Sequence, residues 1–299
     1  MTSATNREAA CIQMPAKNKT ALITGASSGL GLEASRALAA QGFDLIMTAR
    51  GKDRLEKAGE EIAKQNPKSQ ITTQILDVSN FDEVRLFAKK LSSPIDVLMN
   101  NAGVMGPDFS LSVDGIESQM AINHLGHFVL TKALWKQLEK AETPRVISLS
   151  STVHRRGKLQ SMSVEQLTGS DQKNYDRWQR YSDTKLACLL FARELDIRTK
   201  QSGSKVVSIA AHPGWAMTGL QDNFPNRFDR FAQNANQGAR SQIMAAVRAD
   251  LVGGEFIGPA QELWGEPKLI KGTKQSRDLA LMKQLWERSE ELTGATFEV

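Results

Sequence analysis

The sequence predicts an α/β fold in which helices cover both faces of a doubly wound, parallel sheet. Short apolar runs alternate with stretches of helical periodicity from Thr20 onward, and a glycine-rich segment separates the first apolar run from the first helix. Short apolar strands that alternate with helices are typical of parallel sheets buried on both faces. With 299 residues, 40% of them apolar, the chain is long enough to bury such a core.

The predicted elements follow a regular β-α order. Ala21–Ile23 is expected as a buried strand, Leu30–Ala40 as a helix and Phe43–Thr48 as the second strand. The alternation continues with a helix at Asp53–Lys64, a strand at Ile71–Leu76, a helix at Phe81–Leu91, a strand at Ile95–Met99, a helix at Gly115–Glu139, a strand at Arg145–Leu149, a helix at Trp178–Thr199 and a strand at Lys205–Ala210. We therefore expect a single Rossmann domain at residues 19–299, after a flexible leader at residues 1–18.

Two polar stretches interrupt this alternation. One lies between Ser151 and Tyr181, and the other runs from about residue 214 to residue 237. Long insertions in a compact domain are usually functional lids or disordered. The second stretch carries three aromatic residues, Phe224, Phe228 and Phe231. Their spacing favours a substrate lid, with a surface helix docked through the rings as the alternative.

Composition narrows the functional classes. The formal net charge is +5, but the basic residues are interleaved with 33 acidic ones, so we expect no nucleic-acid partner. The two cysteines, Cys11 and Cys188, form no disulfide framework, and no run approaches the roughly 18 apolar residues of a membrane span. We expect a cytoplasmic protein without a membrane anchor. His124 and His127 lack acidic or cysteine partners at metal-binding spacing, so we expect helix packing and no metal.

A candidate nucleotide site follows the first strand. Gly25, Gly29 and Gly31 lie between this strand and the first helix. Glycine lets backbone amides approach a pyrophosphate, and the helix N-terminus adds partial positive charge. An ordinary glycine-rich turn is the alternative. The expected cofactor contacts of this segment are Gly25, Ser27, Ser28, Gly29, Leu30 and Gly31.

The end of the second strand indicates which nucleotide binds. Rossmann proteins that prefer NAD place an acidic residue there for the ribose hydroxyls. This chain has Arg50 at that position, with Lys52 and Ser28 nearby. A guanidinium binds phosphate oxygens in pairs. We therefore expect NADP(H), with its 2′-phosphate, in preference to NAD(H).

Tyr181 and Lys185 form a candidate proton-transfer pair. Four residues apart on a predicted helix, they share one face. A phenol is a poor acid near neutral pH, and an ammonium beside it in a partly dry site favours the phenolate. Taken alone, such a pair is more often a surface feature of an amphipathic helix, so the interpretation depends on the rest of the chain.

Further motifs follow the predicted strands in order. They are Asp77-Val78 after the third strand, Asn100-Asn101-Ala102-Gly103 after the fourth, Asn123 in the long helix, Ser151 after the fifth strand, and Pro213, Gly214, Ala216 and Thr218 after the sixth. Together with the glycine-rich segment and the Tyr181–Lys185 pair, this order resembles the short-chain dehydrogenase/reductase family. The resemblance runs from about Lys19 to the end of the chain.

The resemblance implies a catalytic role for four residues. Ser151 would hydrogen-bond the substrate oxygen, and Tyr181 would donate or accept the proton. Lys185 would favour the ionised form of Tyr181 and hold the ribose, while Asn123 would anchor a water of the proton relay. The cofactor carries the hydride chemistry, and the protein orients it.

The resemblance also implies the remaining cofactor contacts. Asp77 and Val78 would contact the adenine. The segment after the sixth strand would clasp the nicotinamide carboxamide. The complete set beyond the glycine-rich segment is Arg50, Asp77, Val78, Asn101, Ala102, Gly103, Tyr181, Lys185, Pro213, Gly214, Ala216 and Thr218.

Within the family, Asn123-His124-Leu125-Gly126-His127-Phe128 and the long gap before Tyr181 look like the retinol-dehydrogenase and protochlorophyllide-reductase-like branch. We expect hydride transfer between NADP(H) and a ketone, aldehyde or secondary alcohol, and the lid rings with Trp215 indicate a bulky apolar substrate. The alternatives are reduction of a carbon–carbon double bond and a non-catalytic NADP(H)-sensing protein. The family further implies a homodimer or homotetramer through the helices predicted at Gly115–Glu139 and Trp178–Thr199.

Overall fold

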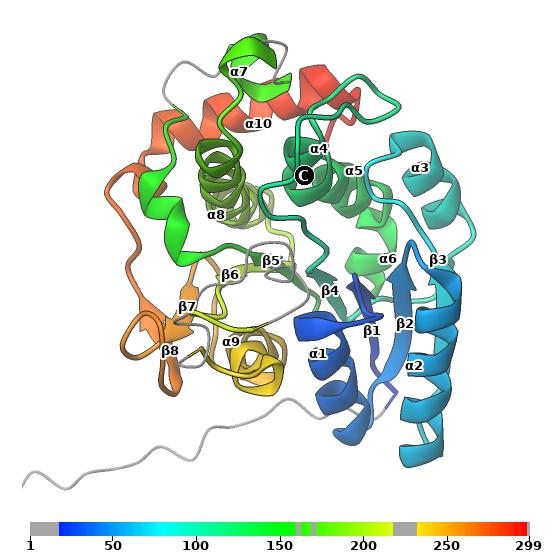
Figure 1. The fold of residues 1–299 in the computed structure, drawn as a ribbon. Helices are drawn as coiled ribbons and strands as arrows, with labels where there is room; N and C mark the ends of the chain where they lie inside the picture. Colours follow the sequence, from blue (N-terminus) through cyan, green and yellow to red (C-terminus); the bar gives the residue numbers. More distant parts are fainter. Residues whose placement is uncertain (1–17, 160–162, 169–171, 218–231, 298–299) are drawn as a thin grey trace, which may run out of the picture.

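An eight-stranded sheet organises the computed structural model, which describes residues 18–159, 163–168, 172–217 and 232–297. The strand order is β3-β2-β1-β4-β5-β6-β7-β8 (Figure 1). Neighbouring strands are parallel except β7 and β8, which are antiparallel. The strands are β1 Thr20–Thr24, β2 Asp44–Ala49, β3 Ile71–Ile75, β4 Val97–Asn100, β5 Arg145–Leu149, β6 Val207–Ala211, β7 Phe256–Pro259 and β8 Pro267–Ile270.

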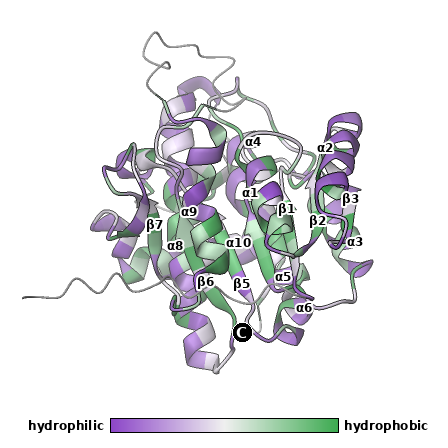
Figure 2. Cartoon of the chain, turned by 90° about the horizontal axis from the view of Figure 1, so that it is seen from below, coloured by the Kyte–Doolittle hydropathy of each residue, from purple (hydrophilic) through white to green (hydrophobic). Residues whose placement is uncertain are grey.

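Helices cover both faces of this sheet, so the predicted doubly wound fold is confirmed. One face carries α1 Gly29–Ala40, α2 Lys52–Gln65 and α9 Ala235–Val247. The other carries α3 Phe81–Lys89, α5 Gly126–Ala133 and α8 Arg177–Ser202, with α10 Leu279–Thr293 packed on α8. The shorter helices are α4 Ser118–Met120, α6 Trp135–Lys140 and α7 Val164–Thr168. Figure 2 shows apolar strands enclosed by helices with hydrophilic outer faces.

Alternation along the strands divides the core into two halves. In β1, Ala21 and Ile23 belong to the hydrophobic cluster under α1, α2 and α9, whereas Leu22 belongs to the cluster under α3, α5 and α8. Successive side chains of a strand point to opposite faces, and both faces here are covered. This is why the central strands read as continuous apolar runs with no polar alternation.

The helix predicted at Gly115–Glu139 is wrong as a single element. Gly115 has φ +73°, in the left-handed region, and helix α4 begins only at Ser118, where the Glu117 carboxylate accepts hydrogen bonds from the first amides. The segment Ala121–Leu125 is a π-helix, and Leu134 separates α5 from α6. The other predicted helices and strands are present, with ends that differ from the prediction by at most three residues.

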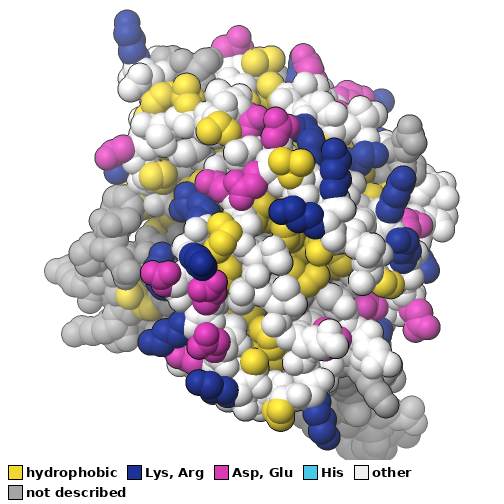
Figure 3. Space-filling view, turned by 90° about the vertical axis from the view of Figure 1, so that its right-hand side faces the viewer, with side chains coloured by type: hydrophobic (Ala, Val, Ile, Leu, Met, Phe, Trp, Pro, Cys, Tyr) yellow, Lys and Arg dark blue, Asp and Glu magenta, His cyan; other side chains and the backbone are white. Residues whose placement is uncertain are grey.

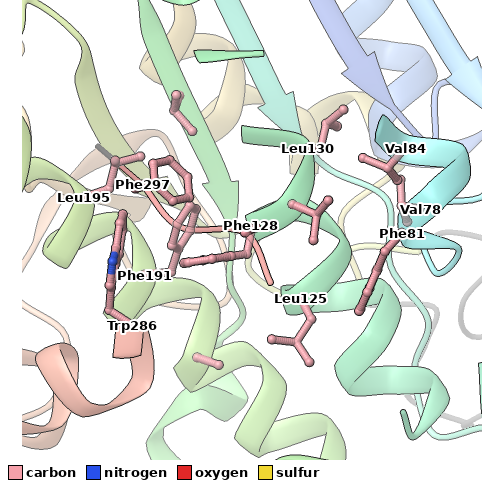
Figure 4. Close-up of a cluster of buried hydrophobic side chains, with 14 of the residues drawn as sticks. Val78, Phe81, Val84, Leu125, Phe128, Leu130, Phe191, Leu195, Trp286 and Phe297 are labelled. Carbon is pink, nitrogen blue, oxygen red and sulfur yellow. The ribbon is translucent and has the colours of Figure 1, made fainter. Parts of the chain in front are cut away.

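The chain after β6 contains elements for which the sequence offered no prediction: α9, β7, β8 and α10. Helix α10 covers the outer face of α8, where Trp286 is 1% exposed. Figure 4 shows Phe128 and Phe191 gathered with Trp286 and Phe297 in this layer. The ring centres of Phe128 and Trp286 are 5.1 Å apart, and those of Trp286 and Phe297 are 4.7 Å apart. Part of the α8 surface proposed above for oligomer contacts is therefore covered by the chain itself.

The outer surface mixes both charges. On the face shown in Figure 3, Lys and Arg side chains lie beside Asp and Glu, with apolar side chains between them. No helix within the described ranges is both long and apolar enough to cross a membrane. Residues 1–17 of the leader, with Cys11, and the three phenylalanines of the predicted lid lie outside the described residues.

Candidate active site

A cavity of about 550 Å³ opens at the carboxyl ends of the central strands. In an open α/β sheet this edge is where ligands bind, because the strand order reverses there and leaves a crevice. The predicted site residues that line the cavity are Leu30, Asn101, Gly103, Ser151, Tyr181, Lys185, Pro213, Gly214 and Ala216. The fold thus brings residues that follow three strands, β4, β5 and β6, and residues of two helices, α1 and α8, to a single space.

The glycine-rich turn has the geometry of a phosphate cradle. Gly25 and Gly29 have φ values of +66° and +55°, which favour glycine. A Cβ atom on Gly31 would lie 2.4 Å from the Gly25 carbonyl oxygen, so this position also requires glycine. The first turn of α1 has neither a side-chain cap nor an acidic residue. Its amides and dipole suit an anion such as a pyrophosphate, so the residues present fit a dinucleotide.

Thr24 joins this turn to the loop after β4. Its hydroxyl oxygen accepts hydrogen bonds from the backbone amides of Asn101 and Ala102, each at 2.9 Å. The side-chain amide of Asn101 also donates to the Thr24 carbonyl at 2.7 Å. Sequence analysis gave Thr24 no role. The signal was a polar residue at the end of an otherwise apolar strand.

Most of the residues predicted to bind the adenosine half of the cofactor are more exposed than Tyr181 and Lys185. Arg50 follows β2 as an exposed side chain and forms no hydrogen bond or ion pair with a residue that the structure describes. Ser28 is also exposed, and Lys52 lies 3.8 Å from Glu56. Asp77 uses its carboxylate locally, accepting from the Ser79 amide and hydroxyl at 2.9 and 2.6 Å. A guanidinium without a protein partner is available to a ligand.

Asn123 lies behind the cavity wall in the π-helical segment. Its side chain accepts from the Val104 amide at 2.8 Å and donates to the Val104 carbonyl at 3.0 Å and to the Thr184 hydroxyl at 2.9 Å. Its carbonyl accepts from the Cys188 thiol at 3.1 Å. Such π-helical segments occur frequently at functional sites. Here the segment connects the loop after β4 to α8.

Tyr181 and Lys185 lie on the face of α8 that borders the cavity. They are 8% and 6% exposed, and the Lys185 ammonium lies 5.6 Å from the centre of the Tyr181 ring. The ammonium donates to the Leu149 carbonyl at 3.1 Å, which fixes it at the end of β5. A Cβ atom on Gly103 would lie 3.5 Å from that ammonium, so the loop after β4 passes close by. The predicted pair is thus partly dry and faces the cavity.

The other tyrosine of the chain is unsuited to proton exchange. The Tyr175 hydroxyl accepts from Gln119 at 2.9 Å and lies 3.1 Å from a Glu117 carboxylate oxygen. Burial, followed by the Glu117 charge, raises the pKa of Tyr175 to about 12. Tyr175 does not line the cavity. Of the two tyrosines, Tyr181 is therefore the one placed to exchange a proton with a ligand in the cavity.

Ser151 stands at the end of β5 and lines the same cavity. Its hydroxyl accepts a long hydrogen bond, 3.4 Å, from the Val153 amide. Its carbonyl accepts from His154 Nδ1 at 2.6 Å, so this nitrogen carries the proton. Burial is the main reason why the pKa of His154 is lowered. Sequence analysis gave no role to His154, whose contact depends on a 3₁₀ turn after the strand.

The segment after β6 is held by a residue that the sequence did not single out. Gln233 donates to the carbonyls of Pro213 and Leu263 at 2.9 and 2.8 Å. Its backbone pairs with Trp215, and Gly214 has φ +75° with no room for a side chain. Thr218, predicted to contact the cofactor, lies outside the described residues.

His124 and His127 are buried in the core. His124 Nε2 lies 2.9 Å from the Ser289 hydroxyl, and His127 Nε2 lies 2.9 Å from the Thr24 hydroxyl. Burial lowers the pKa of His124 to about 3 and that of His127 to about 4. Both imidazoles are therefore neutral near pH 7.

A glycine-rich turn at a helix N-terminus lies next to a cavity lined by the buried Tyr181 and Lys185 and the half-buried Ser151, and this arrangement defines a class of nucleotide-dependent oxidoreductase. The sequence profile of the family described as short chain dehydrogenase matches residues 19–163. Retinol dehydrogenase 12 of Mus musculus is 32% identical, covering 96% of this chain and 89% of the relative. The chain belongs to the short-chain dehydrogenase/reductase family, in its retinol-dehydrogenase-like branch.

A second relative and a solved structure are similar to this chain over most of its length. Short-chain dehydrogenase TIC 32 B, chloroplastic, of Brassica napus is 34% identical over 84% of this chain and 82% of its own. The crystal structure of an uncharacterised protein from Mycobacterium paratuberculosis has a TM-score of 0.81 and 36% identity, covering 95% of this chain and 96% of that one. The family and the fold are therefore shared across nearly the whole length.

Proposed function

We propose that the protein is an NADP(H)-dependent reductase or dehydrogenase that interconverts a ketone or aldehyde and its alcohol in the cavity. The observation that carries this proposal is the Tyr181–Lys185 pair, which faces the cavity beside Ser151. A nicotinamide cofactor, when bound, supplies or accepts the hydride. The chain's own residues then transfer the proton and bind the substrate oxygen.

In the direction of reduction, the Tyr181 hydroxyl donates its proton to the developing alkoxide, and the Ser151 hydroxyl donates a hydrogen bond to the same oxygen. In the direction of oxidation, Tyr181 accepts the proton. The Lys185 ammonium, fixed on the Leu149 carbonyl, keeps positive charge beside the phenol. General acid–base catalysis of this kind contributes about 10²- to 10⁴-fold. Asn123 holds the loop after β4 in place, and we assign it the water-anchoring role of the family.

Arg50 supports the choice of NADP(H). Its exposed guanidinium has no partner among the described residues, and the position lies at the end of β2, where Rossmann proteins contact the ribose. The glycine-rich turn, Asp77, Val78, the loop of Asn101 to Gly103, and the Pro213 to Thr218 segment complete the proposed cofactor site.

Two observations support a bulky apolar substrate. Trp178, Trp215 and Leu263 are among the residues that line the cavity. The mouse relative is named a retinol dehydrogenase, and retinol is an apolar alcohol. We propose residues 214–237 as the lid, since its described ends are joined by backbone hydrogen bonds from the Gln233 amide to the Trp215 carbonyl and from the Met217 amide to the Gln233 carbonyl.

The test is to titrate the protein with NADPH and with NADH by tryptophan fluorescence, then to add ketones, aldehydes and enones and follow cofactor absorbance. Tighter binding of NADPH with oxidation by saturated ketones or aldehydes supports the proposal. Consumption of enones alone would make the protein a double-bond reductase. Tight binding without turnover would favour the sensing alternative.

A further inference from the structure

The cavity contains a second cation that the proposed chemistry does not use. Apart from Lys185, the charged side chain that lines it is Arg156, and none of its described lining residues is acidic. Lys185 is occupied by the Leu149 carbonyl and the Tyr181 ring. Arg156 lies five residues after Ser151, at the end of the 3₁₀ turn Thr152–Arg156.

The backbone of this turn is fastened to the helix that carries Tyr181. The Gln179 side chain donates to the Arg156 carbonyl at 2.9 Å, and the Asp183 carboxylate accepts from the Lys158 amide at 2.7 Å. A Cβ atom on Gly157 would lie 2.8 Å from the Leu186 Cβ atom, so the two segments are in close contact. The backbone that carries Arg156 is therefore held at a fixed position relative to the reacting end of the cavity.

The Arg156 guanidinium has no hydrogen bond or ion pair with any described residue. Its neighbour Arg155 does have one, with Glu262 at 2.6 Å. Arg177, at the start of α8, pairs with Asp108. Arg156 is exposed and lines the cavity, and without a counter-ion among the described residues its guanidinium is available to an anionic group of the ligand. Arginine binds a carboxylate through two parallel hydrogen bonds.

The remaining walls fit a hydrocarbon. Val104 and Met105 line the cavity from the loop after β4, and Trp215 and Leu263 from the segments after β6 and β7. The Trp178 ring lies against Gly106, where a Cβ atom would be 3.2 Å from the indole. A ligand that fills this space has a polar reacting end at Tyr181, an apolar body, and a place for negative charge at Arg156.

We propose that the physiological substrate is an amphipathic oxo acid or hydroxy acid whose carboxylate binds Arg156. This inference rests on the proposed function. In reduction, the hydride of a reduced nicotinamide forms the new C–H bond at the carbonyl carbon, which is reduced to the alcohol, and the nicotinamide is oxidised. The proton on the new hydroxyl comes from Tyr181. The carboxylate takes no part in the redox step and only orients the substrate.

The test compares a medium-chain ω-oxo acid with its methyl ester, which differ only in the charge of the remote end. We expect kcat/KM to favour the acid by about 10- to 100-fold, mainly through KM, as a charge-assisted hydrogen bond allows. Arg156→Ala should remove this preference and leave the ester unchanged, and Arg156→Lys should retain part of it. Arg155→Ala is the matched control, and it should retain the wild-type preference.

Equal use of acid and ester by the wild type, or a parallel loss of both in Arg156→Ala, would overturn the proposal. A second readout does not require turnover: decanoate should quench the cavity tryptophans of the wild type with the cofactor bound and bind at least tenfold more weakly to Arg156→Ala. If no carbonyl compound is reduced, the proposed function fails, and decanoate binding still decides the role of Arg156. Unchanged decanoate binding in Arg156→Ala would contradict it.

Discussion

At the residue scale, the site separates side chains that hold the protein together from those left for a ligand. Asn123 is 2% exposed, and its amide is fully engaged with Val104 and Thr184. Thr24 is 0% exposed and organises the turn after β4. Leaving such a buried group unpaired costs about 1–3 kcal/mol. Arg50, by contrast, is exposed and without a described partner.

Replacing Arg50 by alanine should change cofactor selectivity. Loss of a charge-assisted hydrogen bond to the 2′-phosphate weakens NADPH binding by about 10- to 100-fold, whereas NADH, which lacks that phosphate, is unaffected. Fluorescence titration of both cofactors measures the difference. Lys57→Ala, which removes an exposed cation from α2, should leave both affinities unchanged. An equal loss for both cofactors in Arg50→Ala would show that Arg50 acts elsewhere.

At the scale of elements, the position of α1 relative to β1 and β4 determines the nucleotide cradle. Gly31 in the first turn of α1 packs against the Gly25 carbonyl and the Asn101 side chain. Gly126 plays a comparable role at the start of α5, where a Cβ atom would lie 1.9 Å from the Val78 carbonyl oxygen. Both contacts bring backbones closer than any side chain permits.

Gly31→Ala should therefore displace the start of α1 and weaken NADPH and NADH alike, by tenfold or more. The added Cβ atom would lie 2.4 Å from the Gly25 oxygen and 2.5 Å from Asn101 Nδ2, and overpacking of this kind costs about 1–3 kcal/mol. Gly51→Ala is the control, because its nearest neighbour is an Arg54 nitrogen at 3.7 Å. Calorimetric titration measures both variants, and tight cofactor binding by Gly31→Ala would refute this view of the cradle.

The elements also show where prediction from sequence ends. Apolar periodicity was sufficient for β1 to β6 and for α1, α2, α3 and α8, because each of these elements buries apolar side chains against the core. It missed β7 and β8, which are four residues each and contain Gly or Pro. It missed the π-helical segment, because the close approach of Gly126 to Val78 is a tertiary contact. The site residues were predicted from their order, but Thr24, His154 and Gln233 act through spatial neighbours that sequence spacing does not reveal.

At the scale of the whole molecule, all four histidines of the chain are buried, between 1% and 3% exposed. Burial is the largest cause of the lowered pKa in each, to about 3 for His124 and His212 and to about 4 for His127, with His154 shifted in the same direction. The folded protein therefore keeps these imidazoles neutral under conditions in which the unfolded chain binds protons.

This distribution predicts that stability falls on acidification. The contribution is complete above the unfolded pKa of about 6.5 and is lost as pH falls toward the folded values, at about 1.4 kcal/mol per pH unit for each imidazole. Asp183 and Asp196, whose pKa values are raised by burial, act in the opposite sense but are fewer. Urea unfolding at about pH 7.5 and about pH 5.5 measures the slope. Equal or greater stability at the lower pH would contradict the prediction.

The central claim is that Tyr181 exchanges the proton in a hydride-transfer reaction. The direct measurement is single-turnover oxidation of bound NADPH by a carbonyl substrate in wild type, Tyr181→Phe and Tyr175→Phe. We predict that Tyr181→Phe still binds NADPH but transfers hydride at least about 100-fold more slowly, while Tyr175→Phe, which alters a hydroxyl outside the cavity, keeps its rate. Normal hydride transfer in Tyr181→Phe would contradict the account.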